Sequence, residues 1–118
     1  MTLSSLPFVS LAEAGRALRA GDTSSVALAT LMLERIAEHD GALNAFITVT
    51  ETQALAAAAR ADAALAAGED RGPLHGIPIA IKDLCDTAGV RTTSGSRSFA
   101  APVPDIEAHV VRRLDVSG

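Results

Sequence analysis

The fold is decided by residues 72–83, which read GPLHGIPIAIKD. Residues 77–82 are almost all apolar and largely β-branched, and the pattern changes abruptly to charge at Asp83. Such a run predicts a strand buried on both faces, which occurs inside α/β sheets covered by helices. Ligands of these sheets bind at the carboxyl ends of the strands, and Lys82 lies at such an end.

Two helices are expected before this strand. Apolar residues recur at helical spacing after Ser10, which is placed to form a capping box with Glu13, and Gly21 can end the first helix. A second apolar stripe predicts a helix capped within residues 23–24 and ending near residues 40–41.

Sequence patterns in the middle of the chain predict a short strand followed by a helix. Residues 46–49 are β-branched or aromatic and indicate a strand or extended segment. Thr50 and Gln53 form a second capping-box pair before an alanine-rich helix over residues 51–67, which stops at Gly68.

The last part of the chain is expected to be irregular and then helical. Residues 85–99 are rich in Thr, Ser and Gly, and Asp105 is placed to cap a helix that runs through Leu114. Two or three strands are few for a sheet that needs cover on both faces. The buried strand and its helices therefore predict an α/β fold class, and the small number of strands indicates a fold that is unfinished within residues 1–118.

Composition narrows the function classes. The chain is 48% hydrophobic with a net charge of −4, which suits a globular domain and gives no reason to expect nucleic acid or a membrane surface as partner. No segment resembles a signal peptide or a membrane span. Cys85 is the single cysteine, so no internal disulfide forms and no zinc spacing exists. These features predict a cytoplasmic protein without metal or cofactor.

Lys82 is the candidate catalytic residue. Burial at the end of an apolar strand disfavours a charged ammonium group and favours a neutral amine that can act as a base. The alternative is that its amine reaches solvent or pairs with Asp83 or Asp86. Local physics alone leaves both open.

Other reactive side chains receive structural interpretations. The hydroxyls in the segment Ser94–Ser98 are expected to bond nearby backbone groups. A Cys85 and His75 pair lacks a third, orienting group, so His75 is expected to bond backbone. His39 and His109 are expected on polar helix faces, and the glycines make no phosphate-binding loop, since no G-x-G-x-x-G occurs.

Residues 72–83 resemble the lysine segment of the amidase-signature family. The resemblance extends upstream to residues 43–47 (LNAFI) and downstream to residues 86–96 (DTAGVRTTSGS), and covers the chain from about Ser10 to Leu114. It implies the N-terminal fragment of the amidase-signature fold, with helices plus the first strands of a mixed central sheet covered by helices, in a partial domain over residues 1–118 that ends before the serine-bearing segment. It also implies a Ser, cis-Ser, Lys triad in which a neutral lysine activates a nucleophilic serine through a bridging serine. Lys82 matches the family's lysine. Both serines belong to a later segment of the family, so this chain is expected to be inactive alone.

Three functions follow as hypotheses. The first is the N-terminal part of an amidase that hydrolyses an amide of a small molecule. The second is part of an A-type subunit of glutamyl-tRNA(Gln) amidotransferase, although residues 85–89 (CDTAG) look more like the general amidases. The third is a non-enzymatic domain that binds a partner. Apolar surface left uncovered by missing strands predicts self-association.

Overall fold

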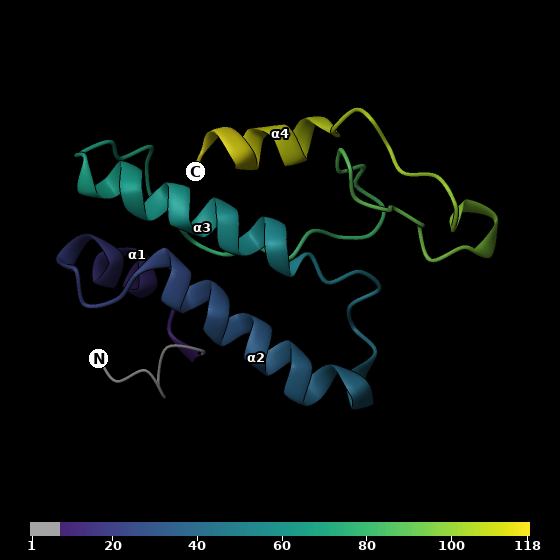
Figure 1. The fold of residues 1–118 in the computed structure, drawn as a ribbon, viewed down its shortest axis with the longest axis horizontal. Helices are drawn as coiled ribbons and strands as arrows, with labels where there is room; N and C mark the ends of the chain where they lie inside the picture. Colours follow the sequence, from purple (N-terminus) through teal and green to yellow (C-terminus); the bar gives the residue numbers. More distant parts are fainter. Residues whose placement is uncertain (1–7) are drawn as a thin grey trace.

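The computed structural model describes residues 8–118 and is drawn in Figure 1. The elements follow the order α1 (Leu11–Ala20), α2 (Ser25–Leu43), α3 (Glu51–Ala66), the 3-10 helix η2 (Arg97–Phe99) and α4 (His109–Val116). α2 and α3 pack side by side and run in opposite directions, while residues 77–108 form a long irregular excursion before α4 (Figure 1).

Both expected boundaries of α1 are confirmed. The Ser10 hydroxyl accepts a hydrogen bond from the Glu13 N–H at 3.2 Å, and the Glu13 carboxylate accepts one from the Ser10 N–H at 2.8 Å. Gly21 ends the helix in the left-handed conformation, with φ of 75°. A capping box and a glycine stop thus fix a helix that is only 10 residues long.

α2 begins where two separate side chains satisfy its first N–H groups. The Ser24 hydroxyl accepts from the Ala27 N–H at 3.0 Å, as the sequence predicts. The Asp62 carboxylate, on α3, accepts from the N–H groups of Ser25 at 2.7 Å and Val26 at 3.1 Å. A negative charge at a helix N-terminus is stabilising, so Asp62 also ties α3 to α2.

α2 ends later than expected. The helix continues past Gly41 to Leu43, and Asn44 takes the left-handed C-cap position with φ of 50°. The Asp40 carboxylate then accepts hydrogen bonds from the N–H groups of Ala45 and Phe46, at 2.7 and 3.1 Å. Asparagine tolerates the left-handed conformation, so the stop falls there rather than at the glycine.

Two expected N-caps are wrong. α3 begins at Glu51, but the Thr50 side chain makes no capping hydrogen bond, and the helix ends at Ala66 with Ala67 as its C-cap. α4 begins at His109 after Ala108, again with no side-chain cap, so Asp105 does not cap it. Strong helix formers such as the alanines of α3 sustain a helix without a cap.

The core is small and lies where α1, the start of α2 and the loop after α3 meet. Its buried residues are Ala14, Leu18, Leu28 and Ile77, and Val9 and Leu31 pack against it. Small side chains on α3, with Ala58 and Ala61 both buried, allow the close approach of its neighbours.

The expected strands are not present among residues 8–118. Residues 77–82 and 46–49 pair with no other segment of the described chain, and the sole β-bridge joins Thr87 and Val90. Ile77 is buried, but Ile79 and Ile81 are 44% and 38% exposed. A strand requires a neighbouring strand for its hydrogen bonds, and none of the described residues supplies one. The expected sheet of the α/β fold class is therefore wrong for the described residues, which form helices and one isolated β-bridge.

Within the described part of the chain, none of the helices combines the length and apolar character that crossing a bilayer requires.

Candidate functional site

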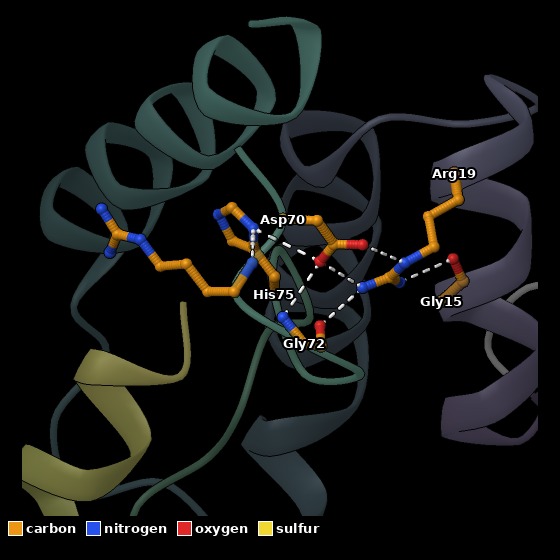
Figure 2. Close-up of polar contacts among 6 residues, drawn as sticks. Gly15, Arg19, Asp70, Gly72 and His75 are labelled. Atoms are coloured by element: carbon orange, nitrogen blue, oxygen red, sulfur yellow. Dashed lines mark hydrogen bonds and ion pairs between the residues drawn. The ribbon is translucent and has the colours of Figure 1, made fainter. Parts of the chain in front are cut away.

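The segment that leads to Lys82 is tied to α1 by a network around Arg19 (Figure 2). The Arg19 guanidinium donates two hydrogen bonds to the Asp70 carboxylate, both at 2.7 Å, and others to the carbonyls of Gly72 at 2.5 Å and Gly15 at 3.0 Å. The Arg19 hydrogen bonds, followed by one from the Gly72 N–H, hold the pKa of Asp70 below its ordinary value. A bidentate pair with these extra bonds fixes where residues 70–72 turn.

His75 is a structural residue of this loop. Its side chain is 2% exposed, and its Nδ1 atom accepts a hydrogen bond from the Arg71 N–H at 3.2 Å. Nδ1 also lies 3.9 Å from the Asp70 carboxylate. The bond from the Arg71 N–H confirms the expectation that His75 bonds the backbone.

Gly76 lies close against the start of α2. Its φ is 81°, and a Cβ built there would collide with the Ser25 hydroxyl oxygen. Its N–H donates to the carbonyl of Gly118 at 2.7 Å, at the end of the α4 segment. Ile77 then enters the core, so residues 75–77 form the anchor from which the extended segment 78–82 leaves the helices.

Lys82 lies at the end of this segment and is exposed, which corrects the expectation that it is buried. Its carbonyl accepts a hydrogen bond from the Cys85 N–H at 2.9 Å, which closes a four-residue turn. Among the described residues the Lys82 amine forms no salt bridge within 4.0 Å, so neither Asp83 nor Asp86 pairs with it. Of the two alternatives to a buried base, the structure shows the amine that reaches solvent.

Asp83 holds a second loop against this turn. Its carboxylate accepts hydrogen bonds from the Thr93 N–H at 2.9 Å, the Thr93 hydroxyl at 2.5 Å and the Gly95 N–H at 3.2 Å. Its backbone carbonyl accepts a fourth, from the Ser94 N–H at 2.7 Å. We call this arrangement of Asp83 with residues 93–95 the Asp83 clamp.

The clamp changes the acid–base behaviour of Asp83. The hydrogen bonds from the Thr93 hydroxyl and N–H, then that from the Gly95 N–H and the charge of Arg91, hold the pKa of Asp83 below its ordinary value of 3.8. Hydrogen bonds donated to a carboxylate stabilise its charged form. Asp83 is therefore an acceptor for the loop at neutral pH.

The serines near Lys82 serve the local backbone. The Ser96 hydroxyl accepts from the Ser98 N–H at 3.3 Å, which starts η2 and confirms the predicted turn chemistry at Ser96. Ser94 has a φ of 52°, and its N–H is used by the clamp.

Other candidate residues are not brought together. Cys85 is a free, half-buried thiol, and the structure describes no hydrogen bond between it and His75. His39 and His109 are exposed on α2 and at the start of α4. No cluster of three or more His, Cys, Asp or Glu side chains suited to a metal ion occurs in residues 8–118.

Sequence reasoning missed the Arg19 network and the Asp83 clamp. Arg19 and Asp70 lie 51 positions apart, and nothing local in either segment indicates the pairing. For the clamp a signal existed: an aspartate followed ten residues later by a Thr-Ser-Gly turn, whose N–H groups need an acceptor.

Comparisons with known proteins identify the family. The Amidase family model matches residues 27–118. Over 109 residues the chain is 56% identical to the glutamyl-tRNA(Gln) amidotransferase A subunit of Azoarcus sp. (strain BH72), and 54% identical to that of Aromatoleum aromaticum, in each case covering 92% of this chain. The structure of native peptide amidase from Stenotrophomonas maltophilia matches 94% of this chain with a TM-score of 0.88 and 36% identity.

The chain belongs to the amidase family. It spans 22% of the length of the two amidotransferase relatives and 23% of the peptide amidase chain.

Proposed function

We propose that this chain supplies the N-terminal part of an enzyme that cleaves an amide carbon–nitrogen bond, with Lys82 as the catalytic base. The observation that carries the proposal is the amidase-like backbone, which matches peptide amidase with a TM-score of 0.88 and presents Lys82, unpaired among the described residues, at the end of residues 78–82. A base must reach the proton that it removes, and the exposed Lys82 amine is accessible to the rest of the enzyme, whose contact would bury the amine and favour its neutral form.

The proposed reaction uses two serines from the remainder of the enzyme. The neutral Lys82 amine takes a proton from a bridging serine, which takes one from the nucleophilic serine as that oxygen attacks the amide carbonyl. The amine product leaves with a proton, and water then hydrolyses the acyl-enzyme. Residues 1–118 alone lack the nucleophile in this scheme and should not hydrolyse amides.

A second candidate is favoured by the names of the relatives. Both amidotransferase relatives are more than half identical to this chain, whereas peptide amidase is 36% identical. In this proposal the enzyme releases ammonia from glutamine and assembles with other proteins. The CDTAG stretch of residues 85–89 counts against it and favours a general amidase.

The exposed apolar side chains fit either candidate. Leu84, Phe99, Val103 and Ile106 are each more than half exposed. We assign this surface to contact with the rest of the enzyme, and in isolation it should drive self-association. A small-molecule amide substrate and a cytoplasmic location, with Cys85 as a free thiol, complete the proposal.

A hybrid enzyme tests the role of Lys82. Residues 1–118 replace the matching N-terminal part of the amidotransferase relative from Azoarcus sp. (strain BH72), and hydrolysis of glutamine and of a C-terminal peptide amide is measured. Lys82→Ala and Lys82→Arg should each lower kcat/KM by at least about 1,000-fold, because Arg stays protonated and cannot act as a base. Arg60→Ala, on the exposed face of α3, is the control.

The outcomes separate the candidates. Preference for glutamine supports the amidotransferase, and preference for the peptide amide supports the general amidase. An inactive hybrid, or activity that survives Lys82→Ala, contradicts the proposed function.

A further inference from the structure

Residues 78–82 leave the helices without lateral support from the described residues. Ile77 is the last residue of the segment in the core, and Ile79 and Ile81 are partly exposed. A lysine amine sits at the end of four methylene groups, so its reach is useful only if the backbone that carries it has a fixed direction. The hydrogen bonds that fix this backbone lie after Lys82 rather than before it.

Two consecutive carbonyls at this point are held by different segments. The Lys82 carbonyl accepts from the Cys85 N–H, and the Asp83 carbonyl accepts from the Ser94 N–H at 2.7 Å. The three further bonds to the Asp83 carboxylate join the same two segments. Thr93, which donates two of them, is 5% exposed, so its hydroxyl has little access to water as an alternative partner.

The two oxygens of the Asp83 carboxylate accept hydrogen bonds from different donors. Oδ1 accepts from the Thr93 N–H, whereas Oδ2 accepts from the Thr93 hydroxyl and the Gly95 N–H. With these bonds in place, the carboxylate faces the 93–95 loop, and it forms no ion pair with Lys82. The described contacts of Asp83 therefore connect it to the lysine turn through the backbone.

We propose that Asp83 is a positioning residue for Lys82: its carboxylate binds the 93–95 loop and thereby fixes the turn from which the Lys82 amine projects. This inference rests on the proposed role of Lys82 as the base. The neighbouring loop contributes a left-handed pair, Ser94 and Gly95 with φ of 52° and 66°, which aims successive N–H groups at Asp83. Asp83 and residues 93–95 are thereby held together by four hydrogen bonds.

Four variants of the 118-residue chain test the proposal. Asp83→Asn keeps the shape and the Oδ1 acceptor but replaces the Oδ2 acceptor with an NH₂ group. Asp86→Asn is the matched control, because it removes the same charge three residues farther along the chain and its side chain makes no described hydrogen bond. Thr93→Val removes one donor to Asp83, and Thr93→Ser restores it.

Two readouts separate positioning from simple loop stability. Amide hydrogen exchange at Ser94 and Gly95 reports the clamp, and Asp83→Asn should accelerate it about tenfold, the factor expected for one hydrogen bond to a charged group. Exchange at the Cys85 N–H and the ¹³Cα signal of Lys82 report the lysine turn. Lys82 is the chain's only lysine, so selective labelling gives a single signal.

The proposal expects both readouts to change together. Asp83→Asn and Thr93→Val should accelerate exchange at Gly95 and at Cys85 and shift the Lys82 signal, while Asp86→Asn and Thr93→Ser should match the unmodified chain. Faster exchange at Ser94 and Gly95 with an unchanged Cys85 N–H and Lys82 signal overturns positioning. Lack of protection at Ser94 and Gly95 in the unmodified chain overturns the clamp itself.

This test is independent of the hybrid enzyme. Activity that survives Lys82→Ala would remove the proposed function and leave the measured coupling between Asp83 and the Lys82 turn in place. Conversely, an active hybrid that requires Lys82 would stand even if Asp83→Asn left that turn unchanged.

Discussion

The helical part of the molecule, residues 10–76, and the irregular part, residues 78–108, differ in how far their apolar side chains are buried. In the helical part, apolar side chains such as Leu18 and Leu28 are buried, although others such as Leu43 are exposed, and caps occupy most helix ends. In the irregular part the backbone is also well bonded, through the Asp83 clamp and the Thr87–Val90 bridge, but its large apolar side chains are exposed.

This difference in burial shows that a segment can form its own hydrogen bonds but needs other segments to bury its apolar side chains. Both partners of each clamp bond lie within the irregular part, 10 to 12 positions apart, so this part makes its own hydrogen bonds. Apolar burial needs surface from elsewhere, and this chain covers only 22–23% of the length of its relatives. The irregular part thus has a defined path, and the other described residues do not cover its apolar side chains.

A matched pair of leucines gives the largest expected effect. Leu18 is 7% exposed and Leu84 is 62% exposed. Leu18→Ala should lower the free energy of unfolding by about 3 kcal/mol, because it removes core contacts and leaves a cavity. Leu84→Ala should change it by less than about 0.5 kcal/mol. Urea denaturation of both variants measures this, and equal losses would show that the two parts do not differ as described.

A pair of glycines sharpens the comparison inside the helical part. Gly76 and Gly68 have nearly equal φ values of 81° and 82°, but only Gly76 lies against a neighbour, the Ser25 hydroxyl. Gly68→Ala should lose about 1 kcal/mol through backbone strain alone. Gly76→Ala should lose about 2 kcal/mol or more, since overpacking adds to the strain. Thermal unfolding compares the two, and equal losses would mean that the close approach at Gly76 carries no weight.

The smallest effect is a local pH dependence in the irregular part. The clamp lowers the pKa of Asp83 in the folded chain, so its contribution is complete above the ordinary value of 3.8 and is lost as pH falls through the lower folded value. An NMR titration of the Asp83 carboxyl carbon should give a midpoint below 3.8. The Gly95 amide signal should change over the same range, and a midpoint at or above 3.8 would contradict the clamp.

Sequence patterns predicted the helices better than the strands for a physical reason. A helix such as α1 satisfies its hydrogen bonds internally, and the residues that start and stop it, Ser10, Glu13 and Gly21, are local. A strand depends on partners that the pattern of residues 77–82 does not contain. The β-branched run of residues 77–82 predicted a buried strand incorrectly, since none of the described residues pairs with it.

The candidate site divides in the same way. A contiguous motif predicts Lys82 as the candidate residue, whereas no contiguous motif predicts the Arg19 network or the Asp83 clamp. One interpretation paired Asp83 with the lysine beside it, but three hydrogen bonds from Thr93 and Gly95 outweigh one exposed ion pair. The pairing of Arg19 with Asp70 depends on how α2 and α3 return the chain, which no local pattern records.

The Arg19–Asp70 pair has a consequence for the order in which the chain folds. Bringing residues 51 positions apart together from an extended chain loses entropy before any contact compensates. We expect α2 and α3 to pair before Arg19 reaches Asp70, because they are joined by the short connection at residues 44–50 and their hairpin returns the loop after α3 to the end where α1 lies (Figure 1). On this argument the contact between α1 and the loop after α3 forms only once that hairpin is in place.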